Sequence, residues 1–491
     1  MWLRTKKYNR RRQYMSTTIT TIKEIRAPLF AIIIGMFMVL LNMTAMNVAI
    51  PNLMNSFQSS LSFMQWATTG YILAEAAIIP VAGWLADRFG SRRMFILAIF
   101  IFTICSILCA LSVNAEQFIL FRVLQGLGGG IVMPIGYAIV FQISPPDKVG
   151  TVMGSYLGVP ILIAPAIGPV FAGWLVDSVS WPFLFWVNVP VGLLGIWFGL
   201  RYLPKLKSQT QAKLDKLGMI FGPIAFAALV YGVNQAGDVG WGSIQTVIGL
   251  AVGVAALLLF ILIELGKSEP LLELRVFRSK SFTSAMLILW ITAAAFYGNF
   301  FLVPVYLQQV KGLNAFDTGL LMISPAIASI VLMQIGGRMY DRFRSVKLLV
   351  IIGTALLGLG AFLLFTDSFG RGKGIIIVAM TLAGSGHALY AMSLNAFVMN
   401  AAPQGLINRV TSLNNASQQV VGSFAVAVFS TLLTTRISAS SHSVPKIDAW
   451  ADAFSSTFLV VMAVAALGVV MGLLLSKPSE QVDKPIDQPT A

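Results

Sequence analysis

Glu75 is a carboxyl side chain placed deep inside a long apolar stretch, where an ionised group is rare. It is the only one of the 19 Asp and Glu residues in such a position, roughly ten residues from either end of the run 64–85. Burying an ionised carboxylate in hydrocarbon is costly, so the group faces a cavity, finds a partner or binds a proton. We therefore predict that Glu75 carries a proton. A permanently protonated or salt-bridged structural glutamate is the alternative.

Arg122 is the matching positive charge, because every other Lys or Arg lies outside the apolar stretches of spanning length or within three residues of their ends. Its guanidinium group stays charged and can bind carboxylates or water through a planar fork. We therefore expect Arg122 to stabilise a nearby carboxylate and to respond to the protonation of that group. A fixed structural ion pair is the alternative.

Polar and aromatic side chains in three other apolar stretches could contact a substrate. Trp290 and Tyr297 are seven residues apart, hence on one helix face, in an aromatic-rich stretch that could stack a flat lipophilic cation. Asn42 either lines a cavity or bonds a neighbouring helix. His387 lies near the centre of the run 374–400 and can change its charge near neutral pH. A lone histidine on a helix is more often a hydrogen-bonded packing residue.

Membrane-spanning helices are the elements that must position these side chains. Only 11% of the 491 residues are charged and 57% are apolar, whereas about a quarter of a soluble protein is charged. Apolar runs of spanning length fall at 28–50, 64–85, 94–113, 117–142, 151–176, 182–203, 216–236, 243–265, 282–307, 317–338, 347–366, 374–400, 408–435 and 454–475. We therefore expect an all-α membrane protein with fourteen transmembrane helices.

The net charge of +15 is a signal of topology and does not indicate a nucleic-acid partner. With residues 1–27 inside, twenty-eight Lys and Arg lie on the inner side, five lie outside, and Arg122 lies within a span. This bias predicts an even number of spans and two cytoplasmic termini. The segment 1–27 lacks a short apolar core with a small-residue cleavage site, so we expect no cleaved signal peptide. Cys105 and Cys109 indicate neither a disulfide framework nor a metal site.

Two predicted inner loops repeat one pattern, a glycine followed by Asp-Arg-Phe and a basic residue. The loops read Gly83-Trp-Leu-Ala-Asp87-Arg88-Phe-Gly90-Ser-Arg92 and Gly337-Arg-Met-Tyr-Asp341-Arg342-Phe-Arg344. The first follows the second span and the other follows the tenth, which predicts a 6+2+6 arrangement. The expected segments are a basic arm 1–27, a six-helix bundle 28–203, linkers with two inserted helices 204–281, a six-helix bundle 282–476 and a polar tail 477–491. Parallel halves with a substrate site at their interface are typical of transporters.

The repeated loops contain residues suited to a gate. Gly83 permits close packing at the inner end of its helix, and Gly90 permits a tight turn. Asp87 can pair with basic residues or cap a helix N-terminus across the inner surface, and such a cluster would hold that face closed. The same gating role is assigned to Arg88, Arg92, Asp341 and Arg342. For the arginines of the first loop, simple anchoring at the inner surface is the alternative.

The first loop resembles the loop signature of the major facilitator superfamily, and the inserted pair points to its fourteen-helix drug/proton antiporter branch. Three further stretches resemble motifs of that branch, namely 41–51 in the first helix, 120–130 in the fourth and 154–173 in the fifth. The resemblance implies an antiporter motif at Gly158, Gly168, Pro169 and Gly173. It also links Arg122 to proton transfer, and Gln125 lies in the fourth-helix motif as a substrate-binding candidate. Asn42 stands where the family usually has an aspartate, so we predict that Glu75 replaces this acid.

The resemblance implies a secondary active transporter of the cell membrane that exports lipophilic, including cationic, drugs in exchange for protons by alternating access. In that function Asn42 and Glu75 would also contact the substrate. The protein would act as a monomer without a cofactor, and the absence of a phosphate-binding P-loop argues against ATP drive. Export of a lipid, fatty acid or other specific small molecule, or uptake of a nutrient, is an alternative. A membrane-embedded enzyme would need clustered catalytic groups, and a receptor would bind its ligand without flux.

Overall fold

The computed structural model describes residues 22–206, 215–267, 269–343, 346–367, 373–402, 406–440 and 446–475. Within these ranges every regular element is a helix. Residues 1–21 of the predicted basic arm and the predicted tail 477–491 lie outside the described residues. Thirteen helices in the described ranges are long and apolar enough to cross a membrane.

The first six predicted spans correspond to helices of an N-terminal half. These helices are α2 (Ile22–Phe57), α4 (Trp66–Phe89), α5 (Ser91–Ala110), α6 (Ala115–Ile143), α8 (Val159–Ser178) and α10 (Asn188–Tyr202). Shorter elements precede three of them, namely α3 (Leu61–Met64), α7 (Val149–Thr151) with the π-helix η1 (Val152–Gly158), and α9 (Phe183–Trp186). The predicted fifth span, 151–176, therefore runs through η1 and α8, and the other thirteen predicted spans match the thirteen spanning helices.

The seventh and eighth predicted spans form a helix pair, followed by the last six. The pair is α11 (Gly218–Val239) and α12 (Ile244–Gly266), and the short 3-10 helix η2 (Leu274–Arg278) follows it. The later helices are α13 (Lys280–Gln309), α14 (Ala315–Leu321) with α15 (Ile323–Phe343), α16 (Val346–Asp367), α17 (Lys373–Asn400), α18 (Ile407–Ser440) and α19 (Lys446–Leu474). Several helices extend beyond the apolar runs, because a helix continues into polar sequence until a capping or breaking residue ends it.

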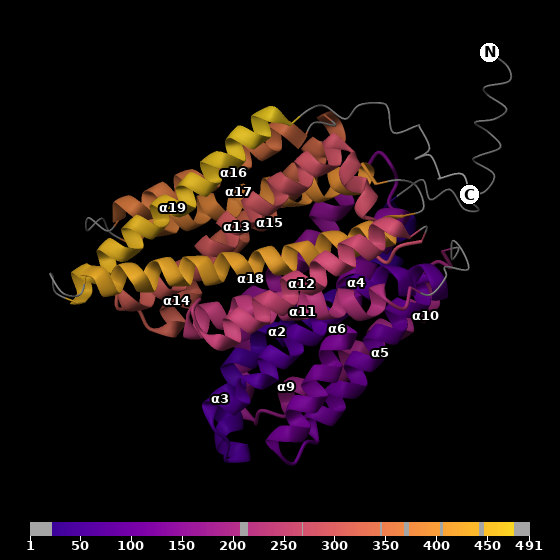
Figure 1. Cartoon of the computed structure of the whole chain (residues 1–491), viewed down its shortest axis with the longest axis horizontal. Coiled ribbons are helices and arrows are strands. Elements are labelled where there is room, and N and C mark those ends of the chain that lie inside the picture. Colours follow the sequence, from indigo (N-terminus) through magenta and orange to yellow (C-terminus); the bar gives the residue numbers. More distant parts are fainter. Residues whose placement is uncertain are drawn as a thin grey trace.

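The helices form two bundles with the inserted pair beside both. Figure 1 shows the early helices in indigo and purple and the late ones in orange and yellow, with α11 and α12 between them in this view. α11 packs on α4 of the first bundle and on α18 of the second. Large apolar side chains such as Trp197 and Leu262 are exposed on the exterior, as expected for helices that face lipid. The chain is therefore an all-α membrane protein in a 6+2+6 arrangement.

Candidate functional site

Close packing of α6 against α4 creates a buried region around Arg122. Gly126 and Gly130, one helical turn apart on α6, lie against the α4 backbone at Tyr71 and Glu75. A Cβ atom at Gly130 would lie only 2.7 Å from the carbonyl oxygen of Glu75. Side chains at these two positions would push the helices apart, because small residues are what allow membrane helices to approach closely. The glycines of the fourth-helix motif thus hold the helix of Arg122 against the helix of Glu75.

The Arg122 guanidinium group is bound by neutral groups. Nη1 donates to Oδ1 of Asn42 and to Oε1 of Gln125, both at 2.6 Å, and Nε donates to the backbone oxygen of Ala67 at 3.3 Å. The ring of Tyr71 lies 4.3 Å from the guanidinium carbon. The side chain is almost fully buried, and within the described residues it forms no ion pair. Arg122 is therefore a buried positive charge without a salt-bridge partner among the described residues.

Hydrogen bonds extend this network to two more helices. Gln125 Nε2 donates to Oγ of Ser106 on α5 at 2.6 Å, and Asn188 Nδ2 on α10 donates to the same oxygen at 3.3 Å. These side chains are fully or almost fully buried. The amide groups of Asn42 and Gln125, which the sequence predicts to bind substrate, thus serve as acceptors that orient Arg122.

Glu75 lies beside this network without joining it. It is 7% exposed, and in the described part of the chain its Oε2 atom has no hydrogen-bond partner. Arg122 is close enough to interact with it electrostatically. An apolar environment favours a neutral carboxyl group, whereas a nearby guanidinium group favours a carboxylate. The geometry therefore suits a group that gains and loses a proton.

Trp290 and Tyr297 both face α18. Trp290 Nε1 donates to Oγ of Ser417 at 3.0 Å, and the Tyr297 ring lies against Gly422. Both side chains are half-buried. The two aromatic residues therefore lie in the second bundle, whereas Asn42 belongs to the Arg122 network of the first.

His387 on α17 faces α13 through a stacked ring. Its imidazole is parallel to the ring of Phe296, with 3.6 Å between centroids and 11° between planes. Nδ1 lies 3.0 Å from the hydroxyl group of Tyr390, which donates to the backbone oxygen of Thr292 at 3.0 Å. His387 is thus a hydrogen-bonded, stacked residue whose side chain is half-buried.

The first repeated loop connects the two bundles through Asp87. Its Oδ2 atom lies 2.8 Å from Nε of Arg409, and its Oδ1 atom accepts from Nδ2 of Asn408 at 2.8 Å. Both residues belong to the first turn of α18. Gly83 makes this approach possible, because a Cβ atom there would lie 2.7 Å from the Asn408 carbonyl oxygen and 2.9 Å from Cα of Arg409. The Asp87–Arg409 pair is buried and joins α4 to α18.

The second repeated loop makes the reciprocal connection through Asp341. Its two carboxylate oxygens accept from the backbone N–H groups of Gly150 and Thr151, at 2.8 and 2.7 Å, at the start of the fifth span. Gly337 of α15 packs against the backbone of Gly150. A carboxylate at a helix N-terminus is favourable because it satisfies backbone donors and complements the helix dipole. Each repeated aspartate thus binds the first turn of a helix from the opposite bundle.

The remaining gating candidates lie outside these inter-bundle bonds. Gly90 connects α4 to α5 with a φ of +91°, which only glycine adopts readily. Arg88 and Arg342 lie over aromatic rings at the inner surface. Arg92 donates from Nη2 to the backbone oxygen of Leu200, within its own bundle. The inner contact between bundles therefore centres on the aspartates and does not include Arg92.

The glycines predicted to form an antiporter motif pack against two different helices. Gly158 lies against Met333 of α15 in the second bundle, and Gly168 lies against α2 in the first. Gly173 leaves room for a methyl group, with 3.8 Å to its nearest neighbour, and Pro169 lies within α8. The motif therefore contributes one close contact between bundles and one within the first bundle.

Several residues of the site were not predicted. Arg409 and Asn408 bind Asp87 across the two bundles, yet the sequence marks Arg409 only as one more inside charge. Tyr71, Ser106 and Asn188 complete the Arg122 network. The available signal was weak: Tyr71 precedes Glu75 by one turn, and Ser106 and Asn188 are polar residues within or beside apolar runs.

Known proteins support the assignment of the fold and of the general activity. The Major Facilitator Superfamily profile matches residues 32–427. A multidrug resistance protein B homolog of Mycobacterium tuberculosis is 32% identical over 397 residues, covering 80% of this chain and 73% of that protein. A tetracenomycin C resistance and export protein of Streptomyces glaucescens is 32% identical over 410 residues, covering 83% and 76%.

A solved structure shows the same fold at low sequence identity. The proton:xylose symporter XylE, a major facilitator protein bound to 6-bromo-6-deoxy-D-glucose, superposes with a TM-score of 0.60 at 14% identity, covering 91% of this chain and 96% of that one. The resemblance in the inner loop, the two-bundle fold and the matched profile agree. This multi-span protein of the cell membrane is a transporter that belongs to the Major Facilitator Superfamily.

Proposed function

We propose that the protein is a proton-driven antiporter that exports lipophilic compounds, including cations, by alternating access. The substrate class is supported by two relatives named for multidrug resistance and for tetracenomycin C resistance and export. Proton coupling is supported by one observation in particular. The buried carboxyl group of Glu75 has an oxygen without a hydrogen-bond partner in the described residues, beside a guanidinium group bound only by neutral acceptors.

In this proposal the proton and Arg122 compete for Glu75. When Glu75 is ionised, the attraction of Arg122 compensates for the loss of water around the carboxylate. When a proton arrives from outside, the carboxyl group becomes neutral and that attraction disappears. The difference between the two states would be transmitted by α4, because Glu75 and the gate residue Asp87 lie on this same helix.

The moving parts would be the bundles predicted at 28–203 and 282–476, with the segment 204–281 as an inserted unit. In the conformation described here the inner ends are joined by the contacts of Asp87 and Asp341. Export requires that these contacts break so that a substrate can enter from the cytoplasm. Trp290, Tyr297 and His387 supply half-buried ring surfaces in the second bundle for a flat lipophilic substrate. A single chain contains all of these parts, so we place the activity in the monomer.

The decisive experiment is substrate-triggered proton flux in liposomes that contain the purified protein. Native protein should move protons across the liposome membrane only when a lipophilic cation is supplied on the side opposite to the proton source. Ethidium is a suitable cation. Glu75→Gln keeps the size of the side chain but removes the titratable group, so proton movement should disappear while ethidium still binds. Glu116→Gln, at the exposed first turn of α6, is the matched control and should behave like the native protein.

Two results would contradict the proposal. Undiminished proton flux in Glu75→Gln would remove Glu75 from the coupling mechanism. Ethidium transport by native protein without any proton movement would refute proton drive itself. Loss of ethidium binding in Glu75→Gln would instead assign the residue to substrate recognition.

A further inference from the structure

An open groove lies on the outside of the first bundle, between the start of α5 and the end of α10. Its volume is about 610 Å³, within the range of sites that bind small organic molecules. The Lys and Arg distribution assigns this end of the bundle to the cytoplasmic surface. The groove therefore lies at the level of lipid headgroups and continues toward the hydrocarbon.

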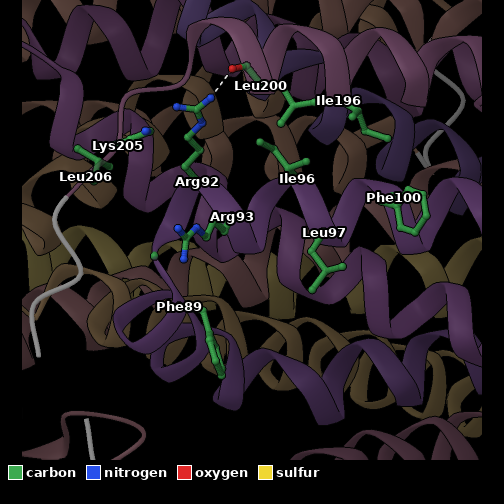
Figure 2. A pocket seen from close by; sticks show the side chains of 11 residues that line it. Phe89, Arg92, Arg93, Ile96, Leu97, Phe100, Ile196, Leu200, Lys205 and Leu206 are labelled. Carbon is green, nitrogen blue, oxygen red and sulfur yellow. Dashed lines mark hydrogen bonds between the residues drawn. The ribbon is translucent and has the colours of Figure 1, made fainter. Parts of the chain in front are cut away.

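The two ends of the groove differ in chemistry. Arg92, Arg93 and Lys205 gather at one end, and Leu97 and Phe100 follow along α5 toward the membrane interior (Figure 2). Leu97 and Phe100 are 45% and 50% exposed. A cationic end joined to an apolar channel matches a molecule with an anionic head and a hydrocarbon tail.

The cations at this end are available to a ligand. Arg93 and Lys205 are exposed, and within the described residues neither is paired with a carboxylate. Arg92 uses one N–H group for the backbone oxygen of Leu200, which orients its guanidinium fork between the two helices. Gly90 precedes the first turn of α5 and makes no side-chain cap, and the positive end of the helix dipole adds to the positive potential there.

We propose that this groove is a binding site for an anionic phospholipid of the cytoplasmic leaflet. Arg93 and Lys205 bind the phosphate group, since guanidinium and ammonium groups form charge-assisted hydrogen bonds to phosphate oxygens. One acyl chain lies along Leu97 and Phe100, and the other faces the bilayer. The bound lipid would connect α5 to α10 next to the loop that carries Asp87.

The test is native mass spectrometry of the full-length protein titrated with defined lipids. Dioleoylphosphatidylglycerol should bind at least about tenfold more tightly than dioleoylphosphatidylcholine, which has the same chains but no net charge. Glycerol 3-phosphate, which carries the phosphate without chains, should not compete at concentrations that saturate the lipid site. Arg93→Gln/Lys205→Gln should reduce the affinity for phosphatidylglycerol about tenfold.

Two further variants distinguish binding in this groove from nonspecific attraction of the lipid to the positive surface. Arg278→Gln/Lys280→Gln removes two exposed cations elsewhere on the inner surface and should leave binding unchanged. Leu97→Trp keeps every charge but fills the channel, so it should also weaken phosphatidylglycerol binding. The proposal is overturned if both lipids bind native protein equally, if the two double variants lose affinity to the same extent, or if glycerol 3-phosphate displaces the lipid.

Discussion

Neutralising Asp87 should open the inner gate. Asp87 and Arg409 are both about 5% exposed at the side chain, so Asp87→Asn leaves a buried guanidinium group without its carboxylate. Removing one partner of a buried ion pair costs about 3–5 kcal/mol. Because each 1.36 kcal/mol is a factor of ten, the equilibrium between closed and open inner ends should shift by roughly 10²- to 10⁴-fold. Because the Asp87 contact joins the inner ends in the structure, a shift of this size should let the variant populate the open form measurably.

The assay is a distance measurement between spin labels on the two bundles. Phe89 at the end of α4 and Phe343 at the end of α15 are exposed, at 45% and 59%, and each can be replaced by a labelled cysteine. The native Cys105 and Cys109 are buried and would be replaced by alanine. Asp87→Asn should add a longer-distance population that the parent lacks.

A double-variant cycle tests the reason for the effect. Arg409→Gln should produce the same longer distance, because it leaves a buried carboxylate unpaired. Asp87→Asn/Arg409→Gln removes both charges and should be shifted less than the sum of the single variants predicts. Unchanged distance distributions in both single variants, or strictly additive shifts in the double variant, would refute the argument.

Two further predictions use the same assays. Gly83→Ala should also open the inner end, because the new Cβ atom would lie 2.7 Å from the Asn408 carbonyl oxygen, and a backbone atom cannot rotate away as a side chain can. The control is Gly242→Ala, which should leave the inner end closed because no atom lies within 4 Å of its Cβ position. Asn42→Asp should place a carboxylate 2.6 Å from the guanidinium group that Asn42 now binds. In liposomes it should restore part of the proton flux lost in Glu75→Gln, and a double variant as inactive as the single one would argue against an interchangeable acid.

The fold could be predicted largely from the sequence because the bilayer imposes simple rules. A backbone segment in hydrocarbon must form its own hydrogen bonds, so a long apolar run identifies a helix. The excess of Lys and Arg on the inner side then sets the direction in which each helix crosses the membrane. What the sequence does not show is that the fifth span, predicted at 151–176, is interrupted: it runs through the π-helix η1 into α8. Helix ends were also misplaced, because they depend on caps and not on hydrophobicity.

The site could be predicted only as separate residues. Glu75 and Arg122 are recognisable because burying a charged group in an apolar run is costly, so such a residue is expected to have a specific role. Their surroundings depend on contacts between distant segments: Asn42 lies 80 residues from Arg122 in sequence and Arg409 lies 322 residues from Asp87. One sequence contains no signal for such pairs. For Asn42 the sequence leaves open a cavity-lining role and a bond to a neighbouring helix. The structure shows such a bond, but its partner, Arg122, is not predictable from the sequence.

If the two bundles rock as proposed, the neutral hydrogen-bond partners of Arg122 imply that transport responds to the membrane potential. A charge fixed within one bundle moves with that bundle, and each elementary charge carried through the full field is worth about 2.3 kcal/mol per 100 mV. If rocking moves Arg122 through a quarter of the field, 100 mV changes the conformational equilibrium by about 0.6 kcal/mol, or roughly threefold. An ionised Glu75 would cancel this effect and a protonated one would restore it. Electrical sensitivity would then depend on proton occupancy.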